Sequence, residues 1–272
     1  MGGAGGLRAA LGASAEDPRR TVAAFRSLDR ALETALGRWR TSDEPIGVLF
    51  SGGVDSSLLV WELRSRRDLE LYTAGVPGSA DPMSARTGAQ LLGLPWRSLP
   101  IDRRRIGRLA DELVPELGGL SSVERSVQLS LALALEVAPR RSLLCGQGID
   151  EMFGGYAHFR PLSVPDRDHR AVADLRRLQE KDWPCTVRVA ARLGGRIEAP
   201  FLDPRFVEAA MAIDPDLRLR APPPKALFRR WALARGLPAE LAGRAKRAMQ
   251  YGSGVDRELR RAALRPPPTE ES

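Results

Sequence analysis

Hydrophobic positions along the chain follow two alternating patterns. Residues 19–39 carry apolar side chains every three or four positions, which is the spacing of a helix with one buried face. Four short apolar runs predict buried strands, at residues 46–50, 69–76, 96–101 and 141–146. Between these runs, helical spacing recurs at residues 58–63, 83–92, 103–114 and 121–137. Strands that alternate with helices predict an α/β fold with a doubly wound parallel sheet.

The rest of the chain has a different pattern. From about residue 161 the spacing predicts mainly helices, joined by loops that contain prolines at positions 165, 200, 215 and 222–224. We expect three parts: an N-terminal segment with its leading helix at residues 1–40, a domain at residues 41–254, and a C-terminal tail at residues 255–272. Residues 1 to about 18 are expected to be loosely ordered, and residues 265–272 disordered.

The first strand leads into a loop of unusual composition, Ser51-Gly52-Gly53-Val54-Asp55-Ser56-Ser57, and then into a helix. Glycines let the backbone approach an anion, and the free N–H groups of a helix N-terminus point at it. The three serines add hydroxyl donors. Asp55 would repel phosphate, unless it holds a divalent cation that bridges to the phosphate oxygens. No Gly-Lys-Ser/Thr follows, so this is not the Walker loop. The alternative is an ordinary glycine turn whose serines cap the helix.

A second dense motif follows the fourth strand. It reads Cys145-Gly146-Gln147-Gly148-Ile149-Asp150-Glu151-Met152-Phe153-Gly154-Gly155-Tyr156. Ligands of doubly wound sheets bind beyond the carboxyl ends of the strands, so Ser51 and Gly146 can face one crevice. Asp150 would then supply a second carboxylate to the cation held by Asp55. Taken alone, the motif is also compatible with a glycine turn that opens a helix with acidic residues in its first turn.

Composition narrows the class of protein. The 272 residues are 43% hydrophobic, without an apolar run of about 18 residues, so we expect no membrane span and a cytoplasmic protein. Cys145 and Cys185 suit a reducing compartment and make no metal cluster. A net charge of +8 fits attraction either to nucleic acid or to ATP. The basic run at residues 103–105 keeps a nucleic-acid partner as an alternative.

The motifs together resemble a known family. The Ser51–Ser57 loop resembles the pyrophosphate loop of the ATP pyrophosphatases, and the pair of motifs resembles the synthetase domain of the asparagine synthetases and of β-lactam synthetase. Four further segments are similar to that family in the same order, at residues 72–81, 199–203 (Ala-Pro-Phe-Leu-Asp), 225–229 (Lys-x-x-Phe-Arg) and 244–254 (Arg-x-Lys). They cover most of residues 46–254. The resemblance implies an adenine nucleotide α-hydrolase-like fold.

The resemblance also implies cofactors and roles at matching positions. ATP and Mg²⁺ are the implied cofactors. Contacts to the nucleotide are implied for Ser51, Gly52, Gly53, Asp55, Ser56, Ser57, Val76, Gly78, Gly146 and Lys225, and metal ligation for Asp55 and Asp150. Catalytic roles are implied for Lys246, Asp55, Asp150 and Gln147, with Lys246 on the phosphates where negative charge builds up. Lys225 and Arg229 are four residues apart on an expected helix, so contact with phosphate and a surface pair both remain open.

Two departures from the family bear on the substrates. Gln147 stands where asparagine synthetases commonly carry Glu or Asp, and a neutral amide binds but does not act as a base at pH 7. The chain begins Met1-Gly2-Gly3, without the cysteine that opens the family's glutaminase domain. We therefore predict an ATP-dependent amide ligase that adenylates a carboxylate, aspartate or a related acid, and takes free ammonia, ammonia from a separate glutaminase, or another amine.

Two alternatives remain at this stage. One is a nucleotide-binding regulatory subunit without turnover, which Gln147 and the missing glutaminase domain favour. The other is a tRNA-modifying ATP pyrophosphatase, which the basic charge favours and the widely separated cysteines disfavour. A homodimer is compatible with the sequence, while nucleic acid and membrane partners are not expected.

Overall fold

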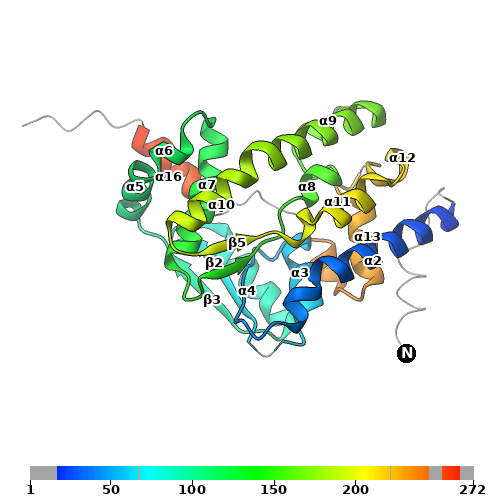
Figure 1. Ribbon diagram of the computed structural model, residues 1–272, viewed down its shortest axis with the longest axis horizontal. Coiled ribbons are helices and arrows are strands. Elements are labelled where there is room, and N and C mark those ends of the chain that lie inside the picture. Colours follow the sequence, from blue (N-terminus) through cyan, green and yellow to red (C-terminus); the bar gives the residue numbers. More distant parts are fainter. Residues whose placement is uncertain (1–16, 67, 221, 245–252, 264–272) are drawn as a thin grey trace, which may run out of the picture.

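The computed structural model describes residues 17–66, 68–220, 222–244 and 253–263. Its centre is a five-stranded sheet in which all neighbouring strands are parallel, in the order β3-β2-β1-β4-β5 (Figure 1). The strands are β1 (Gly47–Leu49), β2 (Glu70–Gly75), β3 (Trp96–Pro100), β4 (Ser142–Leu144) and β5 (Arg196–Glu198). The predicted doubly wound α/β fold is confirmed.

Alternating residues of the central strands bury the two faces of the sheet. Val48 lies opposite Leu71 and Leu144 in the register, and the three pack with helices α2 (Pro18–Thr41), α3 (Val54–Leu63) and α4 (Ala80–Leu92). Leu49 and Leu143 face the other way, toward α7 (Ser122–Val137) and α10 (Trp183–Arg192). Both faces are therefore covered at the centre of the sheet, which explains why β1 and β4 appear in the sequence as continuous apolar runs.

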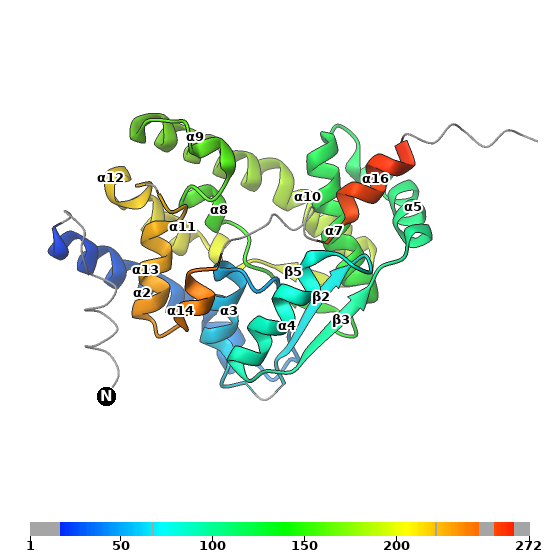
Figure 2. The same cartoon turned by 180° about the vertical axis from the view of Figure 1, so that it is seen from behind.

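The remaining helices lie around these two layers. They are α5 (Arg103–Glu112), α6 (Val114–Leu117), α8 (Ile149–Met152), α9 (Val164–Arg177), α11 (Pro204–Met211), α12 (Pro215–Arg218), α13 (Ala226–Ala234), α14 (Ala239–Ala242) and α16 (Val255–Ala263), with short 3₁₀ and π turns at residues 157–159, 178–182 and 200–202. In both views α5, α7 and α16 gather at one end of the molecule and α2, α12 and α13 at the other (Figure 2). Across the described residues, no helix is both long and apolar enough to cross a membrane.

Helix boundaries follow local sequence signals. Helix α2 begins with Pro18, and the Asp17 side chain caps it by accepting a hydrogen bond from the Arg19 N–H. A reciprocal capping box between Ser121 and Glu124 starts α7. Gly93, in the left-handed region at φ +64°, ends α4. These signals explain why the predicted boundaries of α2, α4 and α7 agree closely with the observed ones.

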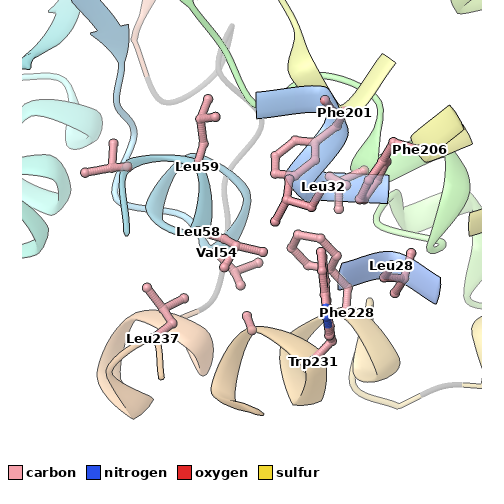
Figure 3. Close-up of a cluster of buried hydrophobic side chains, with 14 of the residues drawn as sticks. Leu28, Leu32, Val54, Leu58, Leu59, Phe201, Phe206, Phe228, Trp231 and Leu237 are labelled. Atoms are coloured by element: carbon pink, nitrogen blue, oxygen red, sulfur yellow. The ribbon is translucent and has the colours of Figure 1, made fainter. Parts of the chain in front are cut away.

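An aromatic and aliphatic cluster supports the helix that follows β1. Leu28 and Leu32 of α2 and Leu58 of α3 pack with aromatic side chains from the C-terminal part of the chain, namely Phe201, Phe206, Phe228 and Trp231 (Figure 3). All are at most 2% exposed. The C-terminal helices therefore form one core with α3, and this core fixes the position of the loop at its N-terminus.

Two regions differ from the sequence-based expectation. The fifth strand, β5, was not predicted; it pairs with β4 at the sheet edge, where Leu143 lies opposite Ile197. Residues 255–263 of the expected tail form α16, which packs on α5 and α7 with Val255 fully buried. The Ser126 hydroxyl bonds the Asp256 carboxylate at 3.0 Å, which fixes this helix further. The expectations for residues 1–16 and 265–272 lie outside the described residues.

A partly buried ion-pair network ties α2, α3 and α13 together. Glu62 of α3, whose side chain is only 6% exposed, accepts two hydrogen bonds from Arg235 at 2.8 and 2.6 Å and one from Arg40 at 2.8 Å. The bonds to Glu62, with the nearby Asp29, raise the pKa of Arg235, against the opposing effect of burial. The network is therefore a stabilising connection and not a surface pair.

Replacing Glu62 by glutamine should lower the free energy of unfolding by about 2 kcal/mol, because two arginines lose charge-assisted bonds in a partly buried place. Urea denaturation followed by circular dichroism measures the change. Glu180→Gln is the matched control: Glu180 pairs with Arg176 on an exposed helix surface and should change stability by less than about 0.5 kcal/mol. Equal stability of the two variants would contradict the assigned role of the network.

Candidate functional site at the switch point of the sheet

The loop between β1 and α3 has the geometry of an anion site. Gly52 has a φ of +71°, and a Cβ there would lie 2.8 Å from the Ser84 carbonyl oxygen, so only glycine fits. Gly53 is the N-cap of α3 and supplies no side-chain cap to the first N–H groups of the helix. Those N–H groups and the positive end of the helix dipole are what an anion binds at a helix start.

Serine hydroxyls line this loop with long, weak hydrogen bonds. Ser51 Oγ accepts from the Gly53 N–H, and Ser56 Oγ accepts from the Ser51 N–H, each at 3.3 Å. Bonds of this length are readily exchanged for bonds to a ligand. Ser57 differs, since it is fully buried and its hydroxyl has no hydrogen-bond partner within the described part of the chain. Its predicted contact with the nucleotide stays a prediction.

The second motif packs directly on the first. A Cβ on Gly146 would lie 3.1 Å from the Asp55 carbonyl carbon and from the Ser56 nitrogen, so the loop after β4 lies against the first turn of α3. Strand order reverses between these two strands, since β2 and β3 lie beyond β1 whereas β5 lies beyond β4. The loops Ser51–Ser57 and Cys145–Asp150 therefore meet at the topological switch point, where ligands of doubly wound sheets bind.

Asp55 and Asp150 converge on one buried cation, the ammonium of Lys225. Lys225 Nζ lies 2.9 and 2.6 Å from the two carboxylate oxygens of Asp55 and 2.5 Å from Asp150 Oδ1. The side chains of Lys225, Asp55 and Asp150 are 2%, 6% and 13% exposed. Gly155 leaves room for this arrangement, since a Cβ there would lie 1.8 Å from Asp150 Oδ1 and 2.3 Å from Lys225 Cε.

Of the two alternatives left open for Lys225 and Arg229, the structure excludes the surface pair, and the contact of Lys225 with phosphate stays a prediction. Lys225 precedes α13 with a left-handed backbone, at φ +60°, and its side chain enters the site. Arg229 instead donates to the carbonyl oxygens of Pro224 and Arg244, each at 3.0 Å. Burial lowers the pKa of Arg229, although Asp55 and Asp150 oppose the shift. Arg229 therefore organises the loops around the site.

Two carboxylates that point at the same place fit a divalent cation. Magnesium in nucleotide sites takes one or two protein carboxylates and completes its shell with water and phosphate oxygens. Among the described residues no group of three or more His, Cys, Asp or Glu side chains forms a metal centre. Asp55 and Asp150 therefore suit a cation that arrives with phosphates better than a permanent structural metal.

Both cysteines are buried, and burial raises the pKa of the Cys145 thiol to about 12, so it stays protonated.

The turn after β2 lies at the carboxyl end of its strand, on the same side of the sheet as the Ser51–Ser57 loop. Val76 is buried and its N–H donates to the Ser253 carbonyl oxygen at 2.8 Å. Gly78 has a φ of +80°, and a Cβ there would meet nothing within 4 Å, so the turn has open space beside it. Since β2 is the neighbour of β1, this turn leaves the same end of the sheet as the Ser51–Ser57 loop. The predicted contact of Val76 and Gly78 with the nucleotide stays a prediction.

Gln147 and Lys246 complete the list of predicted residues. Gln147 is half-buried in the loop before α8, and it precedes Gly148, whose Cβ would lie 2.7 Å from Leu202 Cδ2. Lys246 lies outside the described residues. The described residues on either side of it both lie at the site: Arg244 donates to the Ser84 carbonyl oxygen at 2.6 Å beside Gly52, and Ser253 accepts the bond from Val76.

Glu151 and Tyr156 were quoted in the motif, but sequence reasoning assigned them no role at the site. The Tyr156 hydroxyl donates to Glu151 Oε1 at 2.6 Å. Burial and the neighbouring Glu151 raise the pKa of Tyr156 well above its usual value, so the hydroxyl stays a donor. This bond closes the turn that carries Asp150. The signal in the sequence was the pair Gly154-Gly155, which marks a place where backbone and buried side chains approach closely.

The basic run that favoured a nucleic-acid partner is largely paired within the protein. Arg103 lies 2.7 Å from Glu258 and Arg105 lies 3.8 Å from Glu136, while Arg108, just beyond the run, lies 2.9 Å from Glu112. The run is therefore part of a mixed-charge surface between α5, α7 and α16 and gives no specific support to a tRNA partner.

A groove of about 580 Å³ lies beside the outer strand β5, between this strand and helices α2 and α10. Its lining includes Trp39, Trp183 and Ile197, and none of the residues predicted to bind nucleotide or metal. This groove is therefore separate from the switch-point site.

The sheet and the site define the class: a doubly wound α/β domain with a glycine loop at a helix start and two acidic residues at its switch point. The family is defined by comparison with known proteins. The family model described as asparagine synthase matches residues 27–191 and 164–267, so the chain belongs to the asparagine synthase family, which uses ATP.

Curated relatives agree with this assignment. A putative asparagine synthetase (glutamine-hydrolyzing) of Methanocaldococcus jannaschii is 26% identical in an alignment that covers 87% of this chain and 51% of that protein. Asparagine synthetase B (glutamine-hydrolyzing) of Escherichia coli is 27% identical over 249 residues, which cover 84% of this chain and 44% of that protein. The chain thus spans about half the length, or less, of these relatives.

Proposed function

We propose that the chain is an ATP-dependent carbon–nitrogen ligase, which adenylates a carboxylate with release of pyrophosphate and then joins ammonia or an amine to it with release of AMP. The observation that supports this most directly is the convergence of Asp55 and Asp150 on one cation position beside the glycine loop of α3. Membership of the asparagine synthase family supports the same reaction class. Aspartate or a related acid is the proposed carboxylate.

Each part of the site has a proposed task. The first N–H groups of α3, with the hydroxyls of Ser51 and Ser56, bind the pyrophosphate portion of the nucleotide. Asp55 and Asp150 hold Mg²⁺, which when bound neutralises phosphate charge and stabilises the departing pyrophosphate. Val76 and Gly78 border the nucleoside. Lys246 supplies positive charge to the phosphates as the bond breaks.

Gln147 bears on the second half of the reaction. Its amide can donate to and accept from a bound substrate, but it does not remove a proton at pH 7. The incoming amine must therefore react as the free base or lose its proton to another group. Gln147 orients the carboxylate in this proposal and does not act as the base.

Pyrophosphate release from ATP and Mg²⁺ tests the proposal. The assay compares aspartate with ammonium, a panel of other carboxylates with ammonium, and a control without any acceptor. We expect release that depends on an acceptor and that Asp55→Ala abolishes. Intact ATP binding without release across the whole panel would overturn the ligase assignment in favour of a nucleotide-binding regulatory subunit.

A further inference from the structure

The cation position of the site is taken by a side chain of the protein itself. This side chain belongs to Lys225, the residue immediately before α13, which is far in sequence from both Asp55 and Asp150. Three charge-assisted contacts of 2.5 to 2.9 Å hold the ammonium there, in a place where Lys225 is 3% exposed. A metal ligated by both carboxylates would need the same volume. Ammonium and metal cannot both occupy it.

Displacing the ammonium without a substitute acceptor is unfavourable. A buried lysine that loses both carboxylate partners keeps its charge in a place with little water, which is unfavourable. Mg²⁺ also gives up water reluctantly. Asp55 and Asp150 already face the positive charges of Lys225 and Arg229, so a metal ion alone would leave this group of side chains with excess positive charge. Phosphate oxygens remove both obstacles, because they accept hydrogen bonds from the displaced ammonium and add negative charge.

We propose that Lys225 and the divalent cation exchange places: the metal enters between Asp55 and Asp150 only together with the nucleotide phosphates, and the Lys225 ammonium moves from the carboxylates to those phosphates. This inference rests on the proposed function only in taking Asp55 and Asp150 as the metal ligands. It makes Lys225 a positioning residue that couples metal binding to nucleotide binding. Gly155 makes room for the Lys225 side chain in its observed position, since a Cβ there would lie 2.3 Å from Lys225 Cε.

Binding of Mn²⁺, followed by the electron paramagnetic resonance signal of the free ion, tests the exchange without turnover. The wild-type chain should bind Mn²⁺ at least about tenfold more tightly with α,β-methylene-ATP than without it. Lys225→Met, which keeps the length and removes the charge, should bind Mn²⁺ without the analogue at least about tenfold more tightly than wild type. Lys181→Met, at an exposed lysine on the surface, is the control and should leave both affinities unchanged.

A second substitution locates the metal. Adding Asp150→Asn to Lys225→Met should remove the gained affinity, and retention of the gain would overturn the proposal because the ion would then bind elsewhere. Equal Mn²⁺ affinity of wild type with and without the analogue, after subtraction of the Mn²⁺ that the analogue binds alone, would also overturn it, even where Lys225→Met does not fold. Weaker Mn²⁺ binding by folded Lys225→Met would show that Lys225 holds the carboxylates in place for the metal. Failure of the ligase assignment is seen separately, as absent pyrophosphate release with the coupling intact.

Discussion

Replacing Asp150 by asparagine should lower the rate of pyrophosphate release about 1,000-fold, which corresponds to roughly 4 kcal/mol of lost transition-state stabilisation. Asparagine keeps the shape of the side chain and one oxygen ligand, but it removes one of the two negative charges that face the cation position. The departing pyrophosphate would then leave against a metal that is held less firmly. The measurement is kcat at saturating Mg²⁺ and ATP, with the carboxylate found in the acceptor panel.

Two controls make this result specific. Asp111→Asn, at an exposed position on α5, should change kcat by less than about twofold. Urea denaturation of Asp150→Asn establishes that the variant is folded under assay conditions, because Asp150 also contacts Lys225. A folded Asp150→Asn variant with wild-type kcat would remove Asp150 from the metal site, and with it the main geometric support for the proposed reaction.

The site was predictable from the sequence where its parts are local in the chain. Strand, glycine turn and helix start are consecutive around Ser51–Ser57, so the order of residues determines the geometry of the loop. The meeting of this loop with Gly146 was also predictable, because it follows from a general rule about the carboxyl ends of parallel strands. Both expectations needed only short-range patterns and one topological rule.

The position of the Lys225 side chain could not be predicted from the sequence. Its local sequence allowed a surface pair with Arg229 as readily as a contact inside the site, because spacing on a helix gives no information about burial in a tertiary fold. Its position between Asp55 and Asp150 depends on three segments that are distant in sequence. The aromatic cluster around Phe228, which sets the position of α13, is likewise a product of long-range packing.

The missed fifth strand has a simpler cause. Residues Arg196-Ile197-Glu198 contain a single apolar side chain, because an edge strand is only partly covered and its other two side chains form ion pairs. A three-residue strand with one buried position has no hydrophobic period to detect. Helix α16 was missed for a related reason: its buried Asp256 and Glu258 make it polar in sequence, although it packs closely in the fold.

Replacing Gly155 by alanine should lower the free energy of unfolding by about 3 kcal/mol and abolish pyrophosphate release, because the added methyl would lie 1.8 Å from Asp150 Oδ1 and 2.3 Å from Lys225 Cε. Gly155 is outside the left-handed region, so alanine brings no backbone strain and the expected effect is steric. The clash cannot be relieved by a flexible surface group, since both neighbours are buried members of one ion-pair cluster. Urea denaturation and the pyrophosphate assay measure the two effects.

Gly107→Ala provides the matched control for this substitution. Gly107 lies inside α5, where a Cβ would meet nothing within 4 Å, so the same chemical change should raise stability by up to about 1 kcal/mol through helix propensity alone. The opposite signs expected for the two variants separate the packing at the site from the general effect of replacing glycine. If Gly155→Ala unfolds at the same urea concentration as wild type, the carboxylate of Asp150 does not point at Lys225, and the convergence of the two carboxylates on one cation is wrong.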